Sequence, residues 1–385
     1  MRTHLMFGVD SFLQQAKKYR KLKFALVTND AATTSDRISN RIALLKEGVD
    51  LIKLFSPEHG LSARGGDGAY QKNEVDDVTG LPVISLYGDQ LYPAQEAVEN
   101  IDAILFDIPD IGCRFYSYLW TMTFVMESCA KFDKPFFILD RPNPISGDLD
   151  LAEGPMLDEE NCSSFIGRWS IPIRHSCTLG ELANNFNSKK NIGCDIQIFK
   201  TENWKRNETV IEEGGKFVQP SPAITEKNIL FYPGTGLLEG INVNEGRGTT
   251  EPFKIFGAPW IENILLNEEF EKLKLPGIVS RPYSYRAVYG PYKNEQCLGL
   301  SLDIIDPFLF RPVKTGLSLV KLIASLHPEN CKERLYVTRA NPSGKDHLDR
   351  LTGIHDSFSA ISSGDPGELA SATDWKEMIS PFLIY

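Results

Sequence analysis

Short runs of apolar residues recur through the first half of the chain, and each ends in polar or turn-forming residues. Five of them are FALVTND (24–30), LIKLFSPEHG (51–60), PVISLYGD (82–89), AILFDIPDIG (103–112) and FFILDRPNP (136–144). They are apolar on both faces instead of alternating, which is typical of strands in a parallel sheet that helices cover on both sides. A sixth run, CDIQIFK (194–200), is expected to return to the same sheet.

Segments with helical spacing separate these runs. We predict helices over 35–49 with Ser35 or Asp36 as N-cap, over 93–101 and over 114–132. Another helix is expected from Thr178, which forms a capping box with Glu181. Strands that alternate with helices imply right-handed crossovers, so the expected fold is α/β, with a Rossmann-like, doubly wound, mostly parallel sheet.

The pattern changes after the proline-rich stretch VQPSPAITEKN (218–228). We therefore predict two domains, residues 1–225 and residues 226–385. The second contains a glycine-rich segment (231–253), two alternating segments (283–290 and 298–305) and a helix (315–327), which together favour a smaller α+β domain.

Composition narrows the class of protein. A formal net charge of −10 argues against a general nucleic-acid binder, and any anionic ligand needs a local cluster of arginines. The seven cysteines are odd in number and lack paired short spacings, which favours reduced thiols and argues against a zinc site. No apolar run is long enough for a signal peptide or a membrane span, so we expect the protein to be cytoplasmic. The alternative is a periplasmic protein whose signal peptide has been removed.

Polar residues follow four of the predicted strands, where an open parallel sheet binds its ligands. These residues are Asp30; Glu58 and His59; Asp107 and Arg114; and Asp140, Arg141 and Asn143. A binding site along this edge is therefore predicted. A structural role is the alternative to ligand binding for some of them. Asp30 could equally form hydrogen bonds to the backbone of its loop, and Asp140 and Arg141 could form a structural ion pair.

Glu58 is the strongest candidate for chemistry. It stands between Pro57 and His59 at a strand end, where partial burial raises a carboxyl pKa toward the range of a general acid. His59 fits an orienting or core imidazole better than a metal ligand, because no second histidine lies at ligand spacing. The chain has no G-x-G-x-x-G, P-loop or G-x-S-x-G motif, so no dinucleotide cofactor is expected.

Eight motifs in order along the chain carry a family resemblance: SPEHG, TGLPVISLYG, FDIPDIGCRFYSY, LDRPNPISG, EGP, RHSCTLGELA, YPGTGLLEGINVNEGRGTTEPF and GAPW. With them the sequence resembles the NamZ-type exo-β-N-acetylmuramidases. The resemblance implies a glycosidase that releases N-acetylmuramic acid from non-reducing ends of peptidoglycan fragments, with a smaller C-terminal domain closing the cleft. It also implies no nucleotide cofactor and no metal. We predict a small muropeptide or MurNAc-GlcNAc-type saccharide as substrate, and no nucleic-acid, membrane or protein partner.

The resemblance places the catalytic carboxylate of SPEHG at Glu58, the residue that the strand-end argument also selects. Glycosidases ordinarily need a second carboxyl group. Glu239 is the first choice and Glu153 the second, with Asp140 and Glu127 also possible; alternatively, the acetamido group of the sugar is the nucleophile.

Muramic acid carries a lactyl carboxylate, which a guanidinium binds in a bidentate way. Arg114, Arg141, Arg174 and Arg247 are the candidates, and Tyr116, Asn242 and Glu245 are further predicted substrate contacts. The segment GLSARGGDGAY (60–70) departs from the family pattern, which is expected to affect the fit of the aglycone or peptide stem.

Two other functions stay open at this point. One is a non-catalytic protein that binds a muramyl sugar in the same cleft. The other is a nucleotide-dependent enzyme that uses the Rossmann-like sheet. Hydrolysis of a β-N-acetylmuramide distinguishes the first from an enzyme, and thermal stabilisation by NAD or ATP tests the second.

Overall fold

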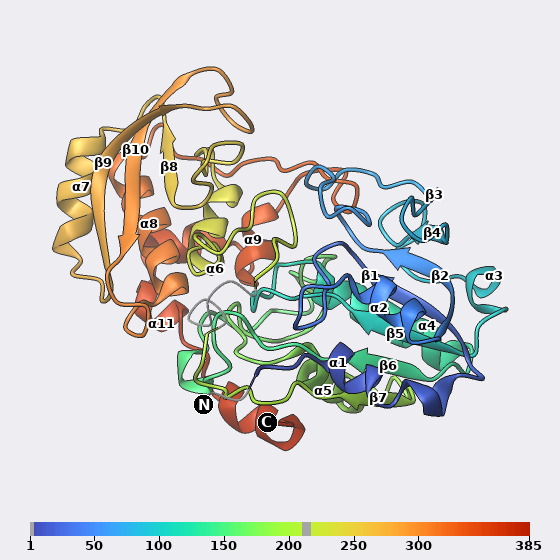
Figure 1. The fold of residues 1–385 in the computed structure, drawn as a ribbon. Helices are drawn as coiled ribbons and strands as arrows, with labels where there is room; N and C mark the ends of the chain where they lie inside the picture. Colours follow the sequence, from blue (N-terminus) through green and yellow to red (C-terminus); the bar gives the residue numbers. More distant parts are fainter. Residues whose placement is uncertain (1–3, 210–216) are drawn as a thin grey trace.

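The computed structural model describes residues 4–209 and 217–385, which form two sheets surrounded by helices (Figure 1). The larger sheet has the strand order β3-β4-β2-β1-β5-β6-β7. Its strands are β1 (Lys23–Thr28), β2 (Asp50–Ser56), β3 (Glu74–Val75), β4 (Pro82–Ser85), β5 (Ala103–Asp107), β6 (Phe136–Leu139) and β7 (Ile196–Phe199). All its neighbouring strands are parallel except the short edge strand β3, which is antiparallel to β4. The predicted mostly parallel α/β sheet is confirmed.

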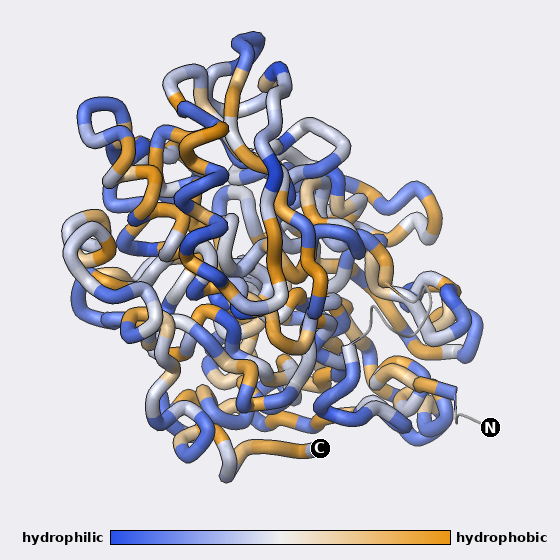
Figure 2. The backbone as a smooth tube through the Cα atoms, turned by 90° about the vertical axis from the view of Figure 1, so that its left-hand side faces the viewer, coloured by the Kyte–Doolittle hydropathy of each residue, from blue (hydrophilic) through white to orange (hydrophobic). Residues whose placement is uncertain are grey.

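Side chains on both faces of this sheet are buried, as the apolar runs predict. In β1, Phe24 and Leu26 join a core with Val9 of α1 (Gly8–Leu13), whereas Ala25 and Val27 join a larger core on the opposite face. Successive strand residues point to opposite faces, so a strand covered on both sides is apolar at most of its positions. Figure 2 shows hydrophobic (orange) and hydrophilic (blue) stretches alternating along the backbone, with blue turns at many of the outermost points.

The helices of this part follow the predicted order but differ at their ends. They are α2 (Asn40–Lys46), α3 (Gln95–Val98), α4 (Tyr118–Lys131) and α5 (Leu179–Lys189), with short 3-10 turns at Ala16–Tyr19 and Leu149–Leu151. The capping box of Thr178 and Glu181 on α5 is confirmed. The expected cap at Ser35 or Asp36 is wrong: Arg37 has a φ of 63° and Thr34 N–H donates to the Ile38 carbonyl, so a turn precedes α2.

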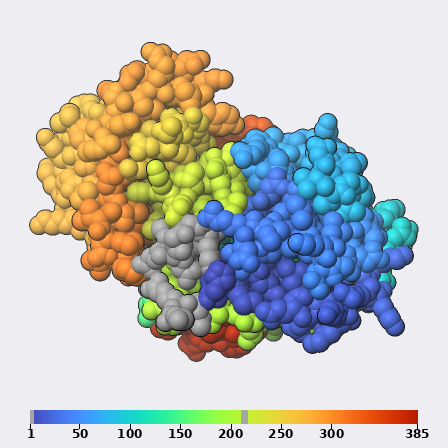
Figure 3. All heavy atoms as spheres, in the orientation of Figure 1, coloured from blue at the N-terminus to red at the C-terminus, as the bar shows by residue number. Residues whose placement is uncertain are grey.

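The second part contains a three-stranded antiparallel sheet of order β8-β10-β9. Its strands are β8 (Ile255–Ala258), β9 (Ile278–Arg286) and β10 (Gln296–Ile304). Its helices are α6 (Tyr232–Thr235), the 3-10 helix η4 (Gly236–Gly240), α7 (Asn263–Lys272), α8 (Pro312–Leu326), α9 (His347–Thr352), α10 (Ser357–Ser363) and α11 (Pro366–Leu369). The glycine-rich segment expected to be a loop thus contains α6 and η4. In Figure 3 the yellow-green segment around α6 lies between the orange sheet region and the blue first part.

The chain then returns to the first sheet through α12 (Trp375–Ile379) and a 3-10 turn at Ser380–Phe382. The Trp375 indole donates to the carbonyl of His175 at 2.9 Å, and the Tyr385 hydroxyl donates to Asp140 at 2.8 Å. The predicted domain boundary near residue 225 stays a proposal, and the last residues described pack on the first of the two proposed domains.

No helix in the ranges 4–209 and 217–385 combines the length and the apolar character needed to cross a bilayer.

Candidate active site

A cavity lies where the loops after β2 and β5 meet α6, η4, α9 and the segment before α9. Its lining residues come from segments distant in sequence: Glu58, His59, Asp67, Gly68, Tyr87, Phe115, Tyr116, Ser117, Ser164, Phe165, Ile166, Ser221, Ala223, Ile224, Tyr232, Glu239, Arg247, Tyr336, Thr338, Ala340, Asn341, His347, Arg350 and Leu351. Of the predicted site residues, Glu58, His59, Tyr116, Glu239 and Arg247 line it. The predicted boundary stretch contributes Ser221, Ala223 and Ile224, so it forms part of the cavity wall.

Glu58 follows the buried strand β2, which fixes its backbone, and only 8% of the residue is exposed. One carboxyl oxygen accepts a hydrogen bond from the Gly68 N–H at 2.9 Å, and the other from the Ser117 hydroxyl at 2.5 Å. Burial is the largest influence and raises the pKa of Glu58, and the nearby Asp67 carboxylate raises it further; His59 and the two hydrogen bonds oppose this only in part. Glu58 therefore holds its proton to higher pH than an ordinary glutamate does.

Asp67 is a second carboxylate in the cavity that we did not predict from the sequence. Its carboxylate accepts a hydrogen bond from the Tyr336 hydroxyl and lies 3.7 Å from the Arg247 guanidinium. Burial raises the pKa of Asp67, but Arg247, His59 and the Tyr336 hydroxyl together lower it below its usual value. The signal in the sequence was an acid among Gly65, Gly66 and Gly68, directly after SPEHG, in the segment that departs from the family pattern.

Gly68 allows this loop to approach the rest of the site. Its φ is +63°, and a Cβ there would lie 2.6 Å from the Thr338 side chain. Only glycine adopts this conformation without strain and leaves that space. Glycine at position 68 therefore keeps its N–H directed at Glu58. It also keeps the neighbouring Asp67 at the cavity.

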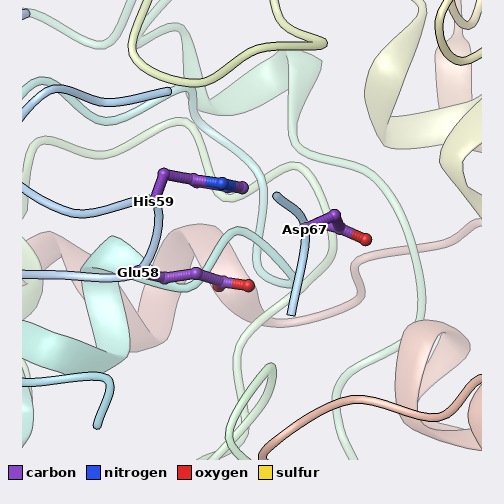
Figure 4. A group of neighbouring side chains, drawn as sticks. All are labelled: Glu58, His59 and Asp67. Carbon is purple, nitrogen blue, oxygen red and sulfur yellow. The ribbon is translucent and has the colours of Figure 1, made fainter. Parts of the chain in front are cut away.

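Glu58 and Asp67 lie close together but have opposite pKa shifts. One ligand atom each from Glu58, His59 and Asp67 falls within 4.8 Å of the others. Figure 4 shows the Glu58 and His59 side chains extending side by side toward the segment that carries Asp67. A pair of carboxyl groups whose surroundings move their pKa values apart supplies one proton donor and one anion, which is the requirement for acid/base chemistry.

His59 orients the loop that joins these carboxylates. Its φ of +67° is in the left-handed region, and its Nδ1 lies 2.9 Å from the Gly65 carbonyl oxygen, while the Gly65 N–H donates to the His59 carbonyl. Because a carbonyl only accepts, Nδ1 carries the hydrogen. A non-glycine residue in this conformation is strained, and such residues cluster at functional sites.

The three residues Glu58, His59 and Asp67 are also spaced closely enough to hold a cation. The chemistry of the donors fits that role poorly. A carboxyl group binds a metal in its ionised form, whereas burial favours the neutral form of Glu58. Both of its oxygens also already accept hydrogen bonds, from Gly68 and Ser117. The arrangement fits proton transfer better.

Arg247 lies on the same wall, surrounded by carboxylates. Its guanidinium donates to Glu239, lies 3.2 Å from Glu245 and 3.7 Å from Asp67, and packs on the Phe253 ring at 4.9 Å. Glu245 lies behind it and is shared with Arg334 at 3.2 Å, so this predicted substrate contact supports Arg247 and does not line the cavity. Arg247 is thus a counter-ion for the site's own acids.

Tyr336 and His347 complete the polar wall from the second part of the chain. Their rings stack with centroids 4.3 Å apart and 9° between the planes, and His347 Nε2 lies 3.7 Å from Glu239. Neither residue stood out in the sequence, because each comes from a polar segment without a recognisable motif. Phe115, Phe165, Ile166, Ile224 and Leu351 give the cavity an apolar side.

Three predicted arginines lie outside the cavity. Arg114 is fully buried and donates to the carbonyls of Pro155, Ile171 and Leu351, and Arg174 is buried and donates to that of Ile145. Burial lowers the pKa of each to about 10. Arg141 is paired with Asp107 at 2.5 Å beside β5. The substrate contacts predicted for these three residues therefore do not lie at this cavity, and the hydrogen bonds that they donate hold loops of the fold.

The remaining predicted residues are also placed elsewhere. Asp30 pairs with Arg41 at 2.8 Å, Asn143 donates to the Cys177 carbonyl, and Asn242 donates to that of Asn330. Asp140 accepts from Gly180 N–H and Tyr385, and burial raises its pKa to about 6. Glu153 accepts from the N–H of Lys314. Each has a structural partner, and none belongs to the site that we retain.

Comparison with known proteins identifies the family of the chain. Residues 24–228 match the family model described as exo-beta-N-acetylmuramidase NamZ, N-terminal, and residues 230–385 match its C-terminal counterpart. The peptidoglycan beta-N-acetylmuramidase NamZ of Bacillus subtilis (strain 168) is 41% identical over 331 residues, covering 84% of this chain and 78% of that protein.

Two crystal structures of DUF1343 family proteins from Bacteroides fragilis NCTC 9343 share the fold. One has a TM-score of 0.87 and 29% identity over 100% of both chains. The other has a TM-score of 0.73 and 25% identity over 100% of this chain and 99% of that one. With both family models matched over nearly the whole sequence, this chain belongs to the exo-β-N-acetylmuramidase NamZ family.

Proposed function

We propose that this chain is an exo-acting glycoside hydrolase that releases N-acetylmuramic acid from the non-reducing ends of peptidoglycan fragments, with Glu58 as general acid/base and Asp67 as the second carboxylate. The observation that carries the proposal is the close pair of Glu58 and Asp67 with opposite pKa shifts in one cavity. Asp67 replaces Glu239 and Glu153 as the partner of Glu58. Glu239 accepts hydrogen bonds from two nitrogens of Arg247, whereas Asp67 lies 3.7 Å from that guanidinium without a hydrogen bond to it. Glu153 lies outside the cavity.

In the first step, protonated Glu58 gives its proton to the bridging oxygen while the bond from that oxygen to the sugar's C1 breaks. Positive charge grows on the sugar ring, and the ionised Asp67 stabilises it. Asp67 then bonds to C1 itself, or it orients the acetamido oxygen that does so. In the second step, Glu58 as carboxylate takes a proton from water as the water oxygen bonds to C1. The bond from C1 to Asp67, or to the acetamido oxygen, breaks and the sugar is released.

The spacing of the two groups favours retention of configuration at C1. Their nearest ligand atoms lie within 4.8 Å. Retaining glycosidases have carboxyl groups about 5–5.5 Å apart, whereas inverting enzymes leave room for a water molecule at roughly 6.5–9.5 Å. Both forms of the second step above give retention.

The test compares two substrates whose leaving groups need a proton to different degrees. For Glu58→Gln we expect kcat on a MurNAc-GlcNAc disaccharide to fall about 10²–10⁴-fold. The loss on a dinitrophenyl β-N-acetylmuramide should be much smaller, because that leaving group departs without protonation. Asp67→Asn should lose activity on both substrates.

The control is Glu127→Gln, whose carboxylate pairs with Arg168 away from the cavity. Equal losses on both substrates for Glu58→Gln would contradict its role as general acid. Tight binding of the sugar by the wild type without turnover would instead support a binding protein.

A further inference from the structure

Two arginines line the cavity, and their charged groups have different surroundings. Arg247 is enclosed by three carboxylates of the protein, those of Asp67, Glu239 and Glu245. Arg350 lines the same cavity and is half-buried, yet its side chain makes no ion pair or hydrogen bond with any residue in the described ranges. Arg350 is therefore an arginine at the cavity whose charge has no counter-ion among the residues described.

The backbone around Arg350 is held firmly. It belongs to α9, where its N–H donates to the Asp346 carbonyl at 3.1 Å. The adjacent acid, Asp349, is already used: its carboxylate accepts from the N–H of Asp356 and from both the N–H and the hydroxyl of Ser357. The guanidinium thus stays available although an acid precedes it in sequence.

The surroundings of Arg350 combine apolar and polar groups. Its neighbour Leu351 and the residues Phe165 and Ile166 line the cavity with it. The turn that carries Phe165 and Ile166 lies against α9, since a Cβ on Gly167 would come within 3.8 Å of the Arg350 carbonyl oxygen. On the same turn, the buried Ser164 hydroxyl has no hydrogen-bond partner among the described residues.

A ligand that suits this corner has a carboxylate, a small apolar group and a further polar atom. The lactyl ether of muramic acid has all three: a carboxylate, a methyl group and an ether oxygen. We propose that Arg350 binds the lactyl carboxylate, with the methyl group against Phe165, Ile166 and Leu351. This assignment rests on the proposed function, because it takes muramic acid as the sugar that enters the cavity.

Electrostatics favour Arg350 over Arg247 for this role. A carboxylate beside Arg247 would also lie beside the acids that surround that guanidinium, and like charges at such distances repel. The chain as a whole has a formal net charge of −10, so an anionic sugar is repelled at long range. An unpaired, half-buried guanidinium offsets this repulsion and binds a carboxylate with two parallel hydrogen bonds.

The test measures binding, so that it does not depend on turnover. Calorimetry gives the Kd of N-acetylmuramic acid and of its lactyl methyl ester for the wild type, Arg350→Gln and Arg350→Lys. We expect the wild type to prefer the acid by about tenfold to hundredfold. Arg350→Gln should remove that preference, and Arg350→Lys should keep part of it, because lysine retains the charge without the bidentate geometry.

The matched control is Arg281→Gln, an exposed arginine of β9, which should behave as the wild type. Circular dichroism and the thermal midpoint show whether each variant is folded. The proposal is overturned if Arg350→Gln keeps the full preference, or if the wild type does not distinguish the acid from the ester. Hydrolysis of the muramide by the wild type, measured separately, decides the proposed function, so the two can fail independently.

Discussion

At the scale of single residues, the site depends on two neighbouring carboxyl groups whose surroundings shift their pKa values in opposite directions. Glu58 is enclosed and faces the negative charge of Asp67, so its pKa is raised. Asp67 faces Arg247 and accepts a hydrogen bond from Tyr336, so its pKa is lowered. Neither difference follows from residue type, because aspartate and glutamate ordinarily titrate within about half a unit of each other.

This difference predicts the pH dependence of kcat/KM. In the proposed mechanism, activity needs protonated Glu58 and should be lost as pH rises through the raised pKa of that group. It also needs ionised Asp67 and should be lost as pH falls through the lowered pKa of that group. In Tyr336→Phe the hydrogen bond that lowers the pKa of Asp67 is gone, and the acid limb should move to higher pH.

Rate profiles of the wild type, Tyr336→Phe and the exposed control Tyr289→Phe check this prediction. Phenylalanine at position 336 can still stack on His347, so the comparison tests the Tyr336 hydroxyl alone. A shift confined to the basic limb would mean that Asp67 is not the group titrating at low pH.

At the scale of elements, helix α8 is joined to the first part of the chain through a buried acid. Glu153 pairs along the backbone with Arg174, and its carboxyl accepts a hydrogen bond from the Lys314 N–H in the first turn of α8. Burial raises the pKa of Glu153 to about 7, although the Arg174 charge lowers it. A residue that we first considered for catalysis thus connects two elements.

Glu153 should make stability depend on pH. Its pKa is higher in the folded than in the unfolded protein, so its favourable contribution is complete below the unfolded pKa and is lost as pH rises through about 7. In Glu153→Gln the decrease in unfolding free energy between pH 5 and pH 8 should be smaller by about 2 kcal/mol. Urea unfolding at both pH values measures it.

The surface variant Glu269→Gln serves as control, since its partner Lys272 lies on the same exposed helix. If Glu153→Gln leaves the pH dependence of the unfolding free energy unchanged, ionisation of Glu153 does not destabilise the folded protein.

At the scale of the whole molecule, the cavity exists only because distant segments meet. One wall comes from the loops after β2 and β5, another from α6 and η4, and a third from residues 336–351. The stretch after β10 and α8 crosses back to the first part, where the Arg339 N–H donates to the Gly68 carbonyl at 3.0 Å. The segment 375–385 adds a further link below the first sheet (Figure 1).

This last link predicts a stability effect without an effect on catalysis. The Tyr385 hydroxyl donates to buried Asp140 at 2.8 Å and accepts from the Thr201 N–H at 2.8 Å. Tyr385→Phe should lower the unfolding free energy by about 1–3 kcal/mol. The loss should be larger above pH 6 than below it, because the hydroxyl favours the ionised form of Asp140, whose pKa is about 6.

Thermal unfolding at pH 5 and pH 8 measures the loss of stability. At temperatures below the unfolding transition, kcat/KM should stay at the wild-type value. A variant as stable as the wild type would show that this contact contributes nothing to folding.

The sequence by itself determined the parallel sheet, the capping box of α5 and the candidacy of Glu58. Each rests on local information: apolar runs without alternation, a Thr-x-x-Glu spacing, and a polar residue at a strand end. Family motifs in order along the chain were likewise readable from the sequence alone.

Only the tertiary structure decided which charged residues share the cavity. Arg114 and Arg174 sit in motifs yet are buried among carbonyls, whereas Asp67 and Arg350 lie in segments without a clear motif and line the cavity. The physical reason is that the pKa and availability of a charged group depend on its burial and its partners. Those partners come from segments up to hundreds of residues away, which no local pattern specifies.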